Sequence, residues 1–568
     1  MTATGATPRR RLLALFALLG APVLFITWFA LRYGYQPVVV ALHVAEVLLA
    51  AIIGFAMMQA ARKRVWVTVI GATMTSAYWT VVIVSAITNE AWGWSVSLDL
   101  ARSYLRYLPD IGRNLPVSPA LIPLALLAGL VFLVVIWVSW WRAAPFVTMR
   151  RVGARYAVAG VVLAVFVMWA RERPYADAEP FTALVTAPGH VNAADARAHN
   201  ARARREYAAP RPARARNVIV IFSDALRADH MGLYGYARAT TPFLSRLDSA
   251  GRLRKVKLAM ATCPFTACGV VSTLASRDTN VLELGSLKLQ DVLHDRGYRT
   301  YFIGASDHTV WYTLRLHYGD AVDYFFDGFS SKRYSLNDDR LVFEGLEGVP
   351  SSSGAPAFFY FFLTSTHVVG TKLPEFRRWT PAVGANAYDN GILQADHSIA
   401  AIFDSLKVKG YLDSSIVVIL GDHGDAFGEH GITGHTLSVY QETLHIPLIF
   451  MAADTATWKN LEFATQSDVA PTILDLLGMP RPSGWEGVSL RSDTAKQFSA
   501  HWTDRARPWR AVIYREGGRT WKYMYVTRWG SLHEELYELT ADPGESNNLV
   551  GAAVARRVLA VVRGHGPH

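Results

Sequence analysis

The chain has little cysteine and little charge for its length. Only two of its 568 residues are cysteine, which excludes a fold stapled by several disulfides. Charged residues make up 18% of the chain and hydrophobic residues 51%, a mixture that indicates part membrane protein and part soluble domain. The length exceeds that of one ordinary domain, and no internal repeat is evident.

The chain also lacks any motif typical of nucleic-acid binding, although its net charge is +11. Much of the excess basic charge lies in loops and in one linker. Such a placement favours contact with an anionic membrane surface and argues against nucleic acid as a partner.

Long hydrophobic runs are concentrated in residues 1–172. Each is close to the ~20 apolar residues that a bilayer helix needs, whereas a cleaved signal peptide would explain only the first. We therefore predict a five-helix transmembrane region with spans at Leu12–Leu31, Val38–Ala60, Val65–Ile87, Ala120–Trp141 and Tyr156–Ala170.

Residues 173–216 differ in composition from what precedes them. The run Ala193–Arg216 is rich in alanine, proline and arginine and offers no apolar face to bury. We interpret residues 173–216 as a basic linker near anionic headgroups, with a solvated charge run of no specific role as the alternative.

From residue 217 to 568 the pattern is that of an α/β domain. Continuous apolar runs rich in β-branched residues predict buried parallel strands, and helical patterns lie between them, notably at Ala395–Leu406 and Gln466–Leu477. The strand candidates are Val218–Phe222, Arg299–Ile303, Ala357–Leu363, Ser415–Leu420 and Ile446–Met451. The alternation predicts a doubly wound, mostly parallel sheet covered on both faces.

Four polar residues follow these strand candidates closely: Asp224, His367, Asp422 and His423. Ligands of such sheets bind beyond the carboxyl ends of the strands. Carboxylate oxygen and imidazole nitrogen suit a divalent ion such as zinc or manganese. A lone aspartate after a strand is more often a cap or turn residue, but Asp422-His423 stands between two glycines that permit close backbone approach.

Several ordered motifs carry a family resemblance. The segments Val218–Tyr236, Gly421–Gly431 with Gly434-His435, and Glu535–Leu549 resemble the opening, the metal-binding part and the C-terminal part of the sulfatase-like branch of the alkaline phosphatase superfamily. The similarity covers about residues 217–550. It implies a sulfatase-like sheet domain with a one- or two-metal site.

The nucleophile separates the branches of that family. True sulfatases carry Cys-x-Pro-x-Arg, whose cysteine becomes formylglycine, and neither Cys263 nor Cys268 fits this pattern. The family spacing, counted back six residues from Ser272, reaches Thr266. A threonine at this position resembles the nucleophile of the membrane-anchored phosphoethanolamine transferases and lipoteichoic acid synthases. Those enzymes also place five membrane helices before an external catalytic domain.

The resemblance implies roles for six residues. Thr266 is the expected nucleophile, and the metal ligands are expected to be Asp224, Thr266, Asp422 and His423. His367 and His435 match histidines that act on the substrate phosphate and the leaving group. Asp224 departs from the glutamate usual in the transferases, and the family's His-x-Pro context is missing after His367. Asp307-His308 lies near the expected place of a sulfatase Lys-x-His element without matching it.

These residues lead us to expect a metal-dependent transferase. It would move a phospho-headgroup, such as phosphoethanolamine or phosphoglycerol, from a phospholipid donor to an envelope glycolipid or glycan acceptor, as in lipid A modification. Its cofactor would be a divalent metal, with zinc favoured and manganese or calcium as alternatives. The alternatives are a sulfuric- or phosphoric-ester hydrolase and a non-catalytic lipid sensor. The catalytic domain would lie on the periplasmic or extracellular side of a multi-pass inner-membrane protein.

Cys263 and Cys268 flank Thr266 in what would be an oxidising compartment. A disulfide between them would close a small loop and hold the nucleophile rigid. Two buried free thiols are the alternative.

The basic clusters predict the orientation of the chain. Residues 9–11, 62–64 and 142–155 should be cytoplasmic, which leaves the N-terminus inside and the C-terminus outside. A C-terminal alkaline phosphatase fusion should therefore be active, and a C-terminal fluorescent protein that folds only in the cytoplasm should be dark. The reverse pattern would reject five spans.

Overall fold

The structure is a computed structural model of the chain. It describes residues 37–61, 64–92, 154–171, 193–207 and 211–565, the last range with short gaps at 213–214, 280, 310–313, 453–457, 504–508 and 529–530. A few isolated positions between residues 24 and 141 are also described.

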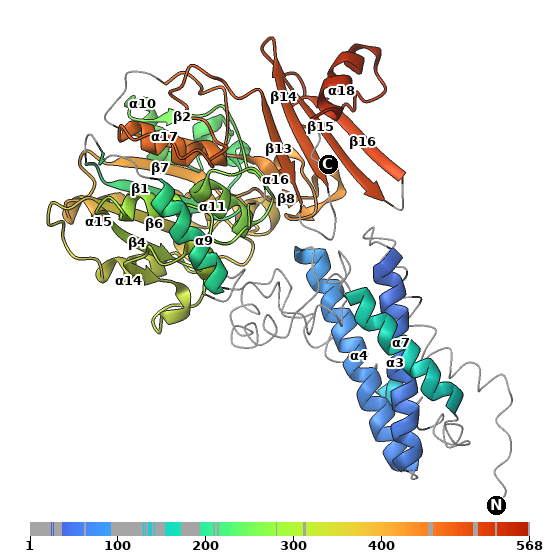
Figure 1. Ribbon diagram of the computed structural model, residues 1–568. Helices are drawn as coiled ribbons and strands as arrows, with labels where there is room; N and C mark the ends of the chain where they lie inside the picture. Colours follow the sequence, from blue (N-terminus) through green and yellow to red (C-terminus); the bar gives the residue numbers. More distant parts are fainter. Residues whose placement is uncertain are drawn as a thin grey trace, which may run out of the picture.

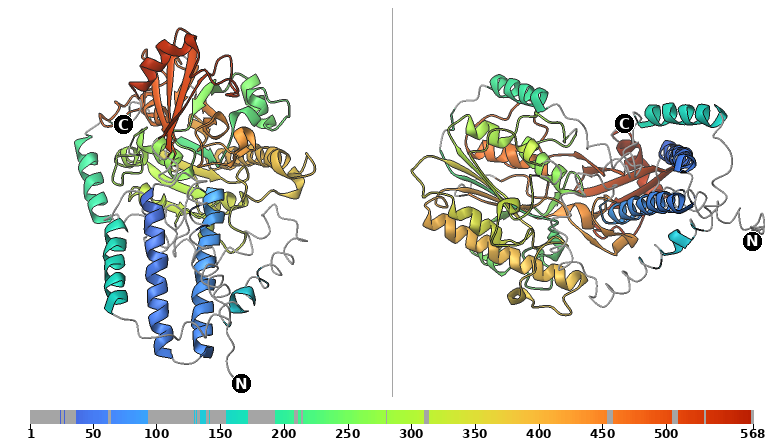
Figure 2. Two further views of the ribbon diagram at one scale, coloured as in Figure 1. Left: turned by 90° about the vertical axis from the view of Figure 1, so that its right-hand side faces the viewer. Right: turned by 90° about the horizontal axis from the view of Figure 1, so that it is seen from below.

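Three apolar helices precede the sheet domain: α3 (Pro37–Ala61), α4 (Arg64–Trp92) and α7 (Ala154–Arg171). They form a group beside the rest of the molecule (Figures 1 and 2). Buried apolar side chains of α3 and α7 contact one another, and His43 of α3 is hydrogen-bonded to the Tyr78 hydroxyl of α4 across 2.9 Å. The group thus has a small packed interior of its own.

The prediction of five membrane spans is not confirmed. Among the described residues, one stretch, Val65–Ile83, is long and apolar enough to cross a membrane. Pro37–Ala50 and Val158–Ala170 are shorter apolar segments in the positions of the second and fifth predicted spans. The predicted spans at 12–31 and 120–141 lie largely outside the described residues.

The basic linker contains a helix that its composition did not lead us to predict. Helix α9 (Ala193–Glu206) is highly polar, and it lies on the sheet domain (Figure 1). Asn200 donates hydrogen bonds to the Ser286 carbonyl and the Asp291 carboxylate, and Arg204 forms an ion pair with Asp295. Gly285 allows the close approach, because a Cβ there would lie 2.5 Å from the Ala196 carbonyl oxygen.

A seven-stranded sheet forms the centre of the α/β domain, in the order β2-β11-β7-β1-β6-β4-β5. Its members are β1 (Val218–Ser223), β2 (Arg254–Lys255), β4 (Arg299–Gly304), β5 (Tyr324–Phe326), β6 (Ala357–Leu363), β7 (Ile416–Gly421) and β11 (Leu448–Met451). Strands β7, β1, β6, β4 and β5 run parallel, as predicted, and only β11 pairs antiparallel with its neighbours.

Both faces of this sheet are buried, which explains why its central strands are apolar at every position. Alternate residues of β1 enter opposite core clusters, with Val220 and Phe222 in one and Ile219 and Ile221 in the other. The first cluster is covered by α11 (Thr266–Ala275), α12 (Leu289–His294) and α17 (Val469–Leu476), and the second by α10 (Pro242–Ser249), α14 (Arg340–Glu347) and α15 (Gly384–Val408).

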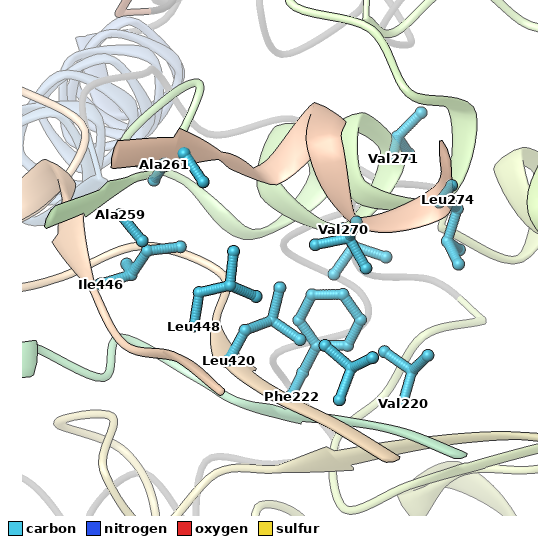
Figure 3. Close-up of a cluster of buried hydrophobic side chains, with 14 of the residues drawn as sticks. Val220, Phe222, Ala259, Ala261, Val270, Val271, Leu274, Leu420, Ile446 and Leu448 are labelled. Atoms are coloured by element: carbon cyan, nitrogen blue, oxygen red, sulfur yellow. The ribbon is translucent and has the colours of Figure 1, made fainter. Parts of the chain in front are cut away.

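Helix α11 has a central place in the first cluster. Figure 3 shows its Val270 directed toward Phe222 of β1 and Leu420 of β7. All ten residues of α11 are buried. The small and apolar composition of this helix therefore lets its backbone lie close to the sheet.

The strand predicted at Ile446–Met451 is in fact two strands. Pro447 has no N–H to donate, and the chain divides there into β10 (His445–Ile446) and β11. Strand β10 joins β3 (Leu258–Met260) and β12 (Phe463–Thr465) in a separate three-stranded sheet. Strand β11 runs antiparallel to β7, so its carboxyl end lies at the opposite edge of the sheet from that of β7.

A four-stranded antiparallel sheet follows, made of β13 (Phe498–Trp502), β14 (Arg510–Glu516), β15 (Arg519–Arg528) and β16 (Ser531–Glu538), with α18 (Arg556–Arg563) packed on it (Figure 1). Lys522 of β15 forms an ion pair with Glu545 at 2.6 Å, and both side chains are 0% exposed. Glu545 also accepts a hydrogen bond from the Gln441 backbone N–H, at the start of the short helix α16 (Gln441–Leu444). This pair joins the C-terminal sheet to the catalytic core.

We expect Lys522→Met to destabilise the catalytic domain by about 3–5 kcal/mol, because it leaves the Glu545 carboxylate buried without its cation. The double variant Lys522→Met/Glu545→Gln should recover much of that loss. Urea denaturation followed by tryptophan fluorescence measures both. A single variant that costs less than about 1 kcal/mol would show that the pair does not join the two parts.

Candidate metal and nucleophile site

Three side chains meet at the carboxyl ends of two adjacent parallel strands. Asp224 follows β1, and Asp422 and His423 follow β7. Their ligand atoms lie within 4.8 Å of one another, and they are the group of acidic, histidine or cysteine side chains in the described part of the chain that could hold a metal ion. All three residues are buried.

Two carboxylate oxygens that face the centre of this cluster have no hydrogen-bond partner. His423 Nδ1 is hydrogen-bonded to the Gly424 carbonyl, which leaves Nε2 directed toward Asp224 Oδ1 at 3.6 Å and Asp422 Oδ2 at 3.5 Å. Both of these carboxylate oxygens are buried without a hydrogen-bond partner. Asp422 Oδ1, in contrast, accepts from the backbone N–H groups of Ala225 and His423.

This arrangement fits a divalent cation. Buried carboxylate oxygens without donors carry a large desolvation cost that a cation would offset. The donor set of two oxygens and one imidazole nitrogen suits zinc, and manganese is also compatible. The bond from His423 Nδ1 to the Gly424 carbonyl fixes the tautomer that exposes Nε2 to a metal.

The pKa shifts of the cluster also fit a bound cation. Burial, followed by the charges of Asp422 and Asp425, raises the pKa of the Asp224 carboxyl well above its usual range. Burial likewise lowers the pKa of the His423 imidazole. The neutral imidazole is the form that binds a metal, whereas a bound cation would displace the proton from Asp224.

Thr266 lies beside this cluster as the first residue of α11. Its Oγ1 is 3.2 Å from His423 Nε2, and the residue is 7% exposed. The N-terminal N–H groups and the dipole of a helix favour negative charge at this end. The structure therefore brings together Thr266 and the three residues proposed as its co-ligands.

Cys263 and Cys268, whose pairing the sequence left open, form a disulfide across the segment that contains Thr266, with their Cα atoms 5.9 Å apart. The five-residue separation spans the extended Phe265 and the first turn of α11. Thr266 is thus held inside a small covalent loop, and neither cysteine is a free thiol.

The two other predicted histidines extend the cluster. The His435 ring is stacked on His423 with a centroid separation of 4.3 Å, and the His367 ring lies 5.1 Å from His435. Burial, with His435, His423 and Lys372 nearby, lowers the pKa of His367 well below its usual range. His367 is therefore neutral at neutral pH.

The structure adds two residues to which the sequence analysis assigned no role. Asp425 Oδ1 lies 3.3 Å from His435 Nδ1, within hydrogen-bonding distance, so Asp425 can orient that ring. Lys372 donates to the His367 carbonyl, and burial lowers its pKa to about 8, against the attraction of Asp339, Asp425 and Asp224. Asp425 could have been suspected from its place next to Gly424, but no local pattern marks Lys372.

Other histidines near the motifs lie outside the cluster. His308 Nδ1 bonds to the Tyr318 hydroxyl at 2.8 Å, and its ring packs on Phe362. His430, in the glycine-rich loop, forms an ion pair with Glu442 and stacks on Tyr440. These contacts give both residues structural partners away from the ligand set.

The sequence of this region matches two families. Residues 216–479 match the Sulfatase family, and residues 428–564 match the C-terminal part of N-sulphoglucosamine sulphohydrolase. The domain belongs to the sulfatase-like branch of the alkaline phosphatase superfamily. The sulfatase-like domain thus accounts for the sheet and for the position of the cluster at its carboxyl edge.

The individual relatives include both a sulfatase and a lipoteichoic acid synthase. The chain is 27% identical over 169 residues to arylsulfatase K of Bos taurus, which covers 28% of this chain and 31% of that protein. It is 28% identical over 212 residues to lipoteichoic acid synthase 2 of Bacillus subtilis, covering 33% and 32%. The match spans about a third of the length of each of these curated relatives.

Among solved structures, the C-terminal periplasmic domain of EcEptC from Escherichia coli aligns with a TM-score of 0.43 and 19% identity. That alignment covers 53% of this chain and 94% of the EptC domain.

Removing one carboxylate of the cluster should remove the metal. We expect Asp422→Ala to lose at least one bound divalent ion per chain and to lose turnover, because Asp422 supplies one of the two unpartnered oxygens. Elemental analysis of the purified protein measures the metal. Asp307→Ala, which changes a carboxylate outside the cluster, is the control. Full metal occupancy in Asp422→Ala would overturn the ligand set.

Proposed function

We propose that the protein is a membrane-bound, metal-dependent transferase that moves a phospho-headgroup from a phospholipid to an envelope glycolipid or glycan. The transfer passes through a phosphothreonine at Thr266. Phosphoethanolamine and phosphoglycerol are the headgroups that the resemblance favours. The catalytic domain would lie on the outer side of the membrane.

One observation carries the choice of Thr266. Its hydroxyl lies 3.2 Å from His423 Nε2, whereas the chain's two cysteines are bonded to each other. A cysteine held in a disulfide cannot become the formylglycine on which true sulfatases depend. The threonine is therefore the side chain best supported as the nucleophile.

The metal is proposed to be held by Asp224, Asp422, His423 and Thr266. When bound, a divalent ion supplies positive charge that lowers the pKa of a ligating hydroxyl and neutralises phosphoryl oxygens. The protein's own contribution is position. Thr266 Oγ, which would have lost its proton to water when the metal binds, attacks the phosphorus in line, the bond from phosphorus to the lipid alcohol breaks, and the headgroup phosphate remains on Thr266.

The stacked histidines suit the departure of the lipid alcohol. His435 faces the Asp425 carboxylate at 3.3 Å, which orients the ring. We assign it the proton that the leaving alcohol takes up. His367 is held neutral by burial and is better suited to donate a hydrogen bond to a phosphoryl oxygen. In the second half-reaction the acceptor hydroxyl attacks the phosphorus of phosphothreonine and gives its proton to His435, while the bond from phosphorus to Thr266 Oγ breaks and the Thr266 alkoxide is restored.

A contact with the helix group supports a lipid donor. Helix α4 contacts β9 (Thr433–Gly434), which pairs with β8 (Ala426–Phe427) and directly precedes His435. The apolar stretch Val65–Ile83 belongs to that helix. A helix that enters the bilayer would thus end beside the loop that carries the proposed acid.

A second function, hydrolysis of a sulfuric or phosphoric ester, is favoured by the match to the Sulfatase and sulphohydrolase families. In that case water would take the place of the acceptor hydroxyl. A non-catalytic lipid sensor has less support, because the nucleophile and the three other ligand residues lie together.

Thr266→Ala should fold, keep most of its metal and lose at least ~10³-fold in turnover, because no other hydroxyl can form the covalent bond. Thr266→Ser should keep part of the activity, since only a methyl group is lost. Cys263→Ser and Cys268→Ser should cost far less at the chemical step, although they cost stability. The comparison uses initial rates at matched folded fraction. Wild-type turnover in Thr266→Ala would contradict the assignment.

Mass spectrometry of Thr266 identifies the transferred group. The purified full chain is incubated with vesicles that contain phosphatidylethanolamine or phosphatidylglycerol and is digested with protease. A mass increase on the peptide containing Thr266 that matches one headgroup phosphate supports the transferase. An unmodified Thr266 together with released sulfate or phosphate from model esters would favour the hydrolase.

A further inference from the structure

Gln466 connects the nucleophile segment to the metal-ligand segment. Its Oε1 accepts the backbone N–H of Thr262 at 3.0 Å, and its Nε2 donates to the carbonyls of Asp422 at 2.7 Å and Gly421 at 3.1 Å. The side chain is 0% exposed, and its acceptor and both its donors are used. One amide thus joins the residue before the disulfide loop to the peptide of a proposed ligand.

Thr262 carries this connection into helix α11. Its Oγ1 forms a 2.6 Å hydrogen bond with the Ser272 hydroxyl, two turns along the helix that begins at Thr266. The backbone and side chain of Thr262 are therefore held from opposite directions. A shift of α11 relative to β7 would strain both bonds.

Gly269 sets how closely α11 can approach β7. A Cβ at this position would lie 2.1 Å from the Asp422 carbonyl oxygen and 2.8 Å from its carbonyl carbon. No side chain fits there unless the helix or the strand end moves. The helix backbone therefore rests on the peptide of the same ligand residue that Gln466 holds.

Gln466 is itself held by its neighbours. The Lys496 ammonium donates to the hydroxyls of Thr465 and Ser467, on either side of Gln466, and pairs with the carboxylates of Asp278 and Asp468 at 3.0 Å. The Lys496 side chain is 9% exposed. A buried ion-pair network of this kind gives the Gln466 backbone one fixed position.

We propose that Gln466 and Gly269 are positioning residues that fix the separation between the nucleophile Thr266 and the ligand Asp422. The proposal rests on the proposed function only for its effect on turnover. Gly269 sets the shortest distance between α11 and the end of β7, and Gln466 prevents the two from moving apart. The Thr266 hydroxyl is then held at the cluster before substrate arrives.

The expected effect lies in the chemical step. A displacement of reacting atoms by about 1 Å can cost ~100-fold in rate. Gln466→Met keeps the length of the side chain but removes all three bridging hydrogen bonds, so kcat should fall by about 100-fold while KM changes little. Gln466→Glu keeps the acceptor for Thr262 but sets a carboxylate against two carbonyls, and it should not restore the rate. Gly269→Ala should lower kcat as well, because α11 and Asp422 must move apart.

Gln290→Met is the matched control. Gln290 is also 0% exposed, and its Nε2 donates to the Tyr318 carbonyl at 3.0 Å, but it contacts neither α11 nor β7 through that bond. Its replacement tests the general cost of losing a buried amide. We expect a lower Tm in both methionine variants and a large loss of kcat only in Gln466→Met.

Two measurements do not depend on turnover. In the metal-free full chain, amide hydrogen exchange of the peptide containing residues 262–269 should be faster in Gln466→Met than in Gln290→Met. In the cobalt-loaded chain, the visible absorption spectrum should shift in Gln466→Met and in Gly269→Ala, because Thr266 moves relative to the ligand set.

These readouts separate the possible failures. If wild-type protein transfers no headgroup, the proposed function fails, whereas exchange and absorption still test the positioning role. Unchanged exchange and absorption in Gln466→Met would overturn that role. It would also be overturned by an equal loss of kcat in Gln290→Met at matched folded fraction, or by a loss of kcat that only follows a loss of bound metal.

Discussion

Two buried carboxylates at the edge of a parallel sheet are the constraint on which the site depends. Asp224 and Asp422 follow adjacent strands, so the sheet itself brings them together, and each keeps one oxygen without a donor. Such a pair is costly unless positive charge lies nearby. The Lys372 ammonium and the N-terminus of α11 both lie at this edge, and each can lower that cost. The polar residues around the cluster are thus explained by its charge.

The same fold can serve ester hydrolysis or group transfer, because the reacting side chain is a single residue at the start of one helix. In this chain the residue that we propose for this role is a threonine, and the cysteines on either side of it are joined. On this proposal the sulfatase-like domain keeps the candidate metal-binding edge while its nucleophile is of another kind. The family assignment alone therefore does not decide between ester hydrolysis and group transfer. The disulfide argues against a formylglycine nucleophile, because neither cysteine is a free thiol.

The central strands could be predicted because burial on both faces makes their sequences continuously apolar. Strands β1, β4, β6 and β7 were found within one residue of their bounds for this reason. Strands β2, β3 and β5 have only two or three residues, too few to leave a pattern. The division at Pro447 was missed because the apolar run continues across the proline. Helix α9 was missed because polar contacts with the sheet domain stabilise it in place of an apolar face.

For the site, sequence reasoning was strongest where residues follow strands. Asp224, His367, Asp422 and His423 were expected together on that ground, and Thr266 and His435 came from the resemblance. The structure puts all six in one place, while their roles stay predictions. Gln466 could not be found, because it acts through backbone groups that are distant in sequence, and Lys372 could not be found, because its bond to the nearby His367 carbonyl follows no known motif. Such contacts leave no spacing rule in a single sequence.

Helix α9 has a consequence for how the enzyme meets its substrate. Its 14 residues form a rod about 21 Å long that is fixed to the sulfatase-like domain. Only residues 172–192 then connect that body to α7. With α7 in the bilayer, as we propose, the domain samples a small volume above the lipid surface. A donor confined to that surface has a high effective concentration, so weak binding of each lipid is enough for steady turnover.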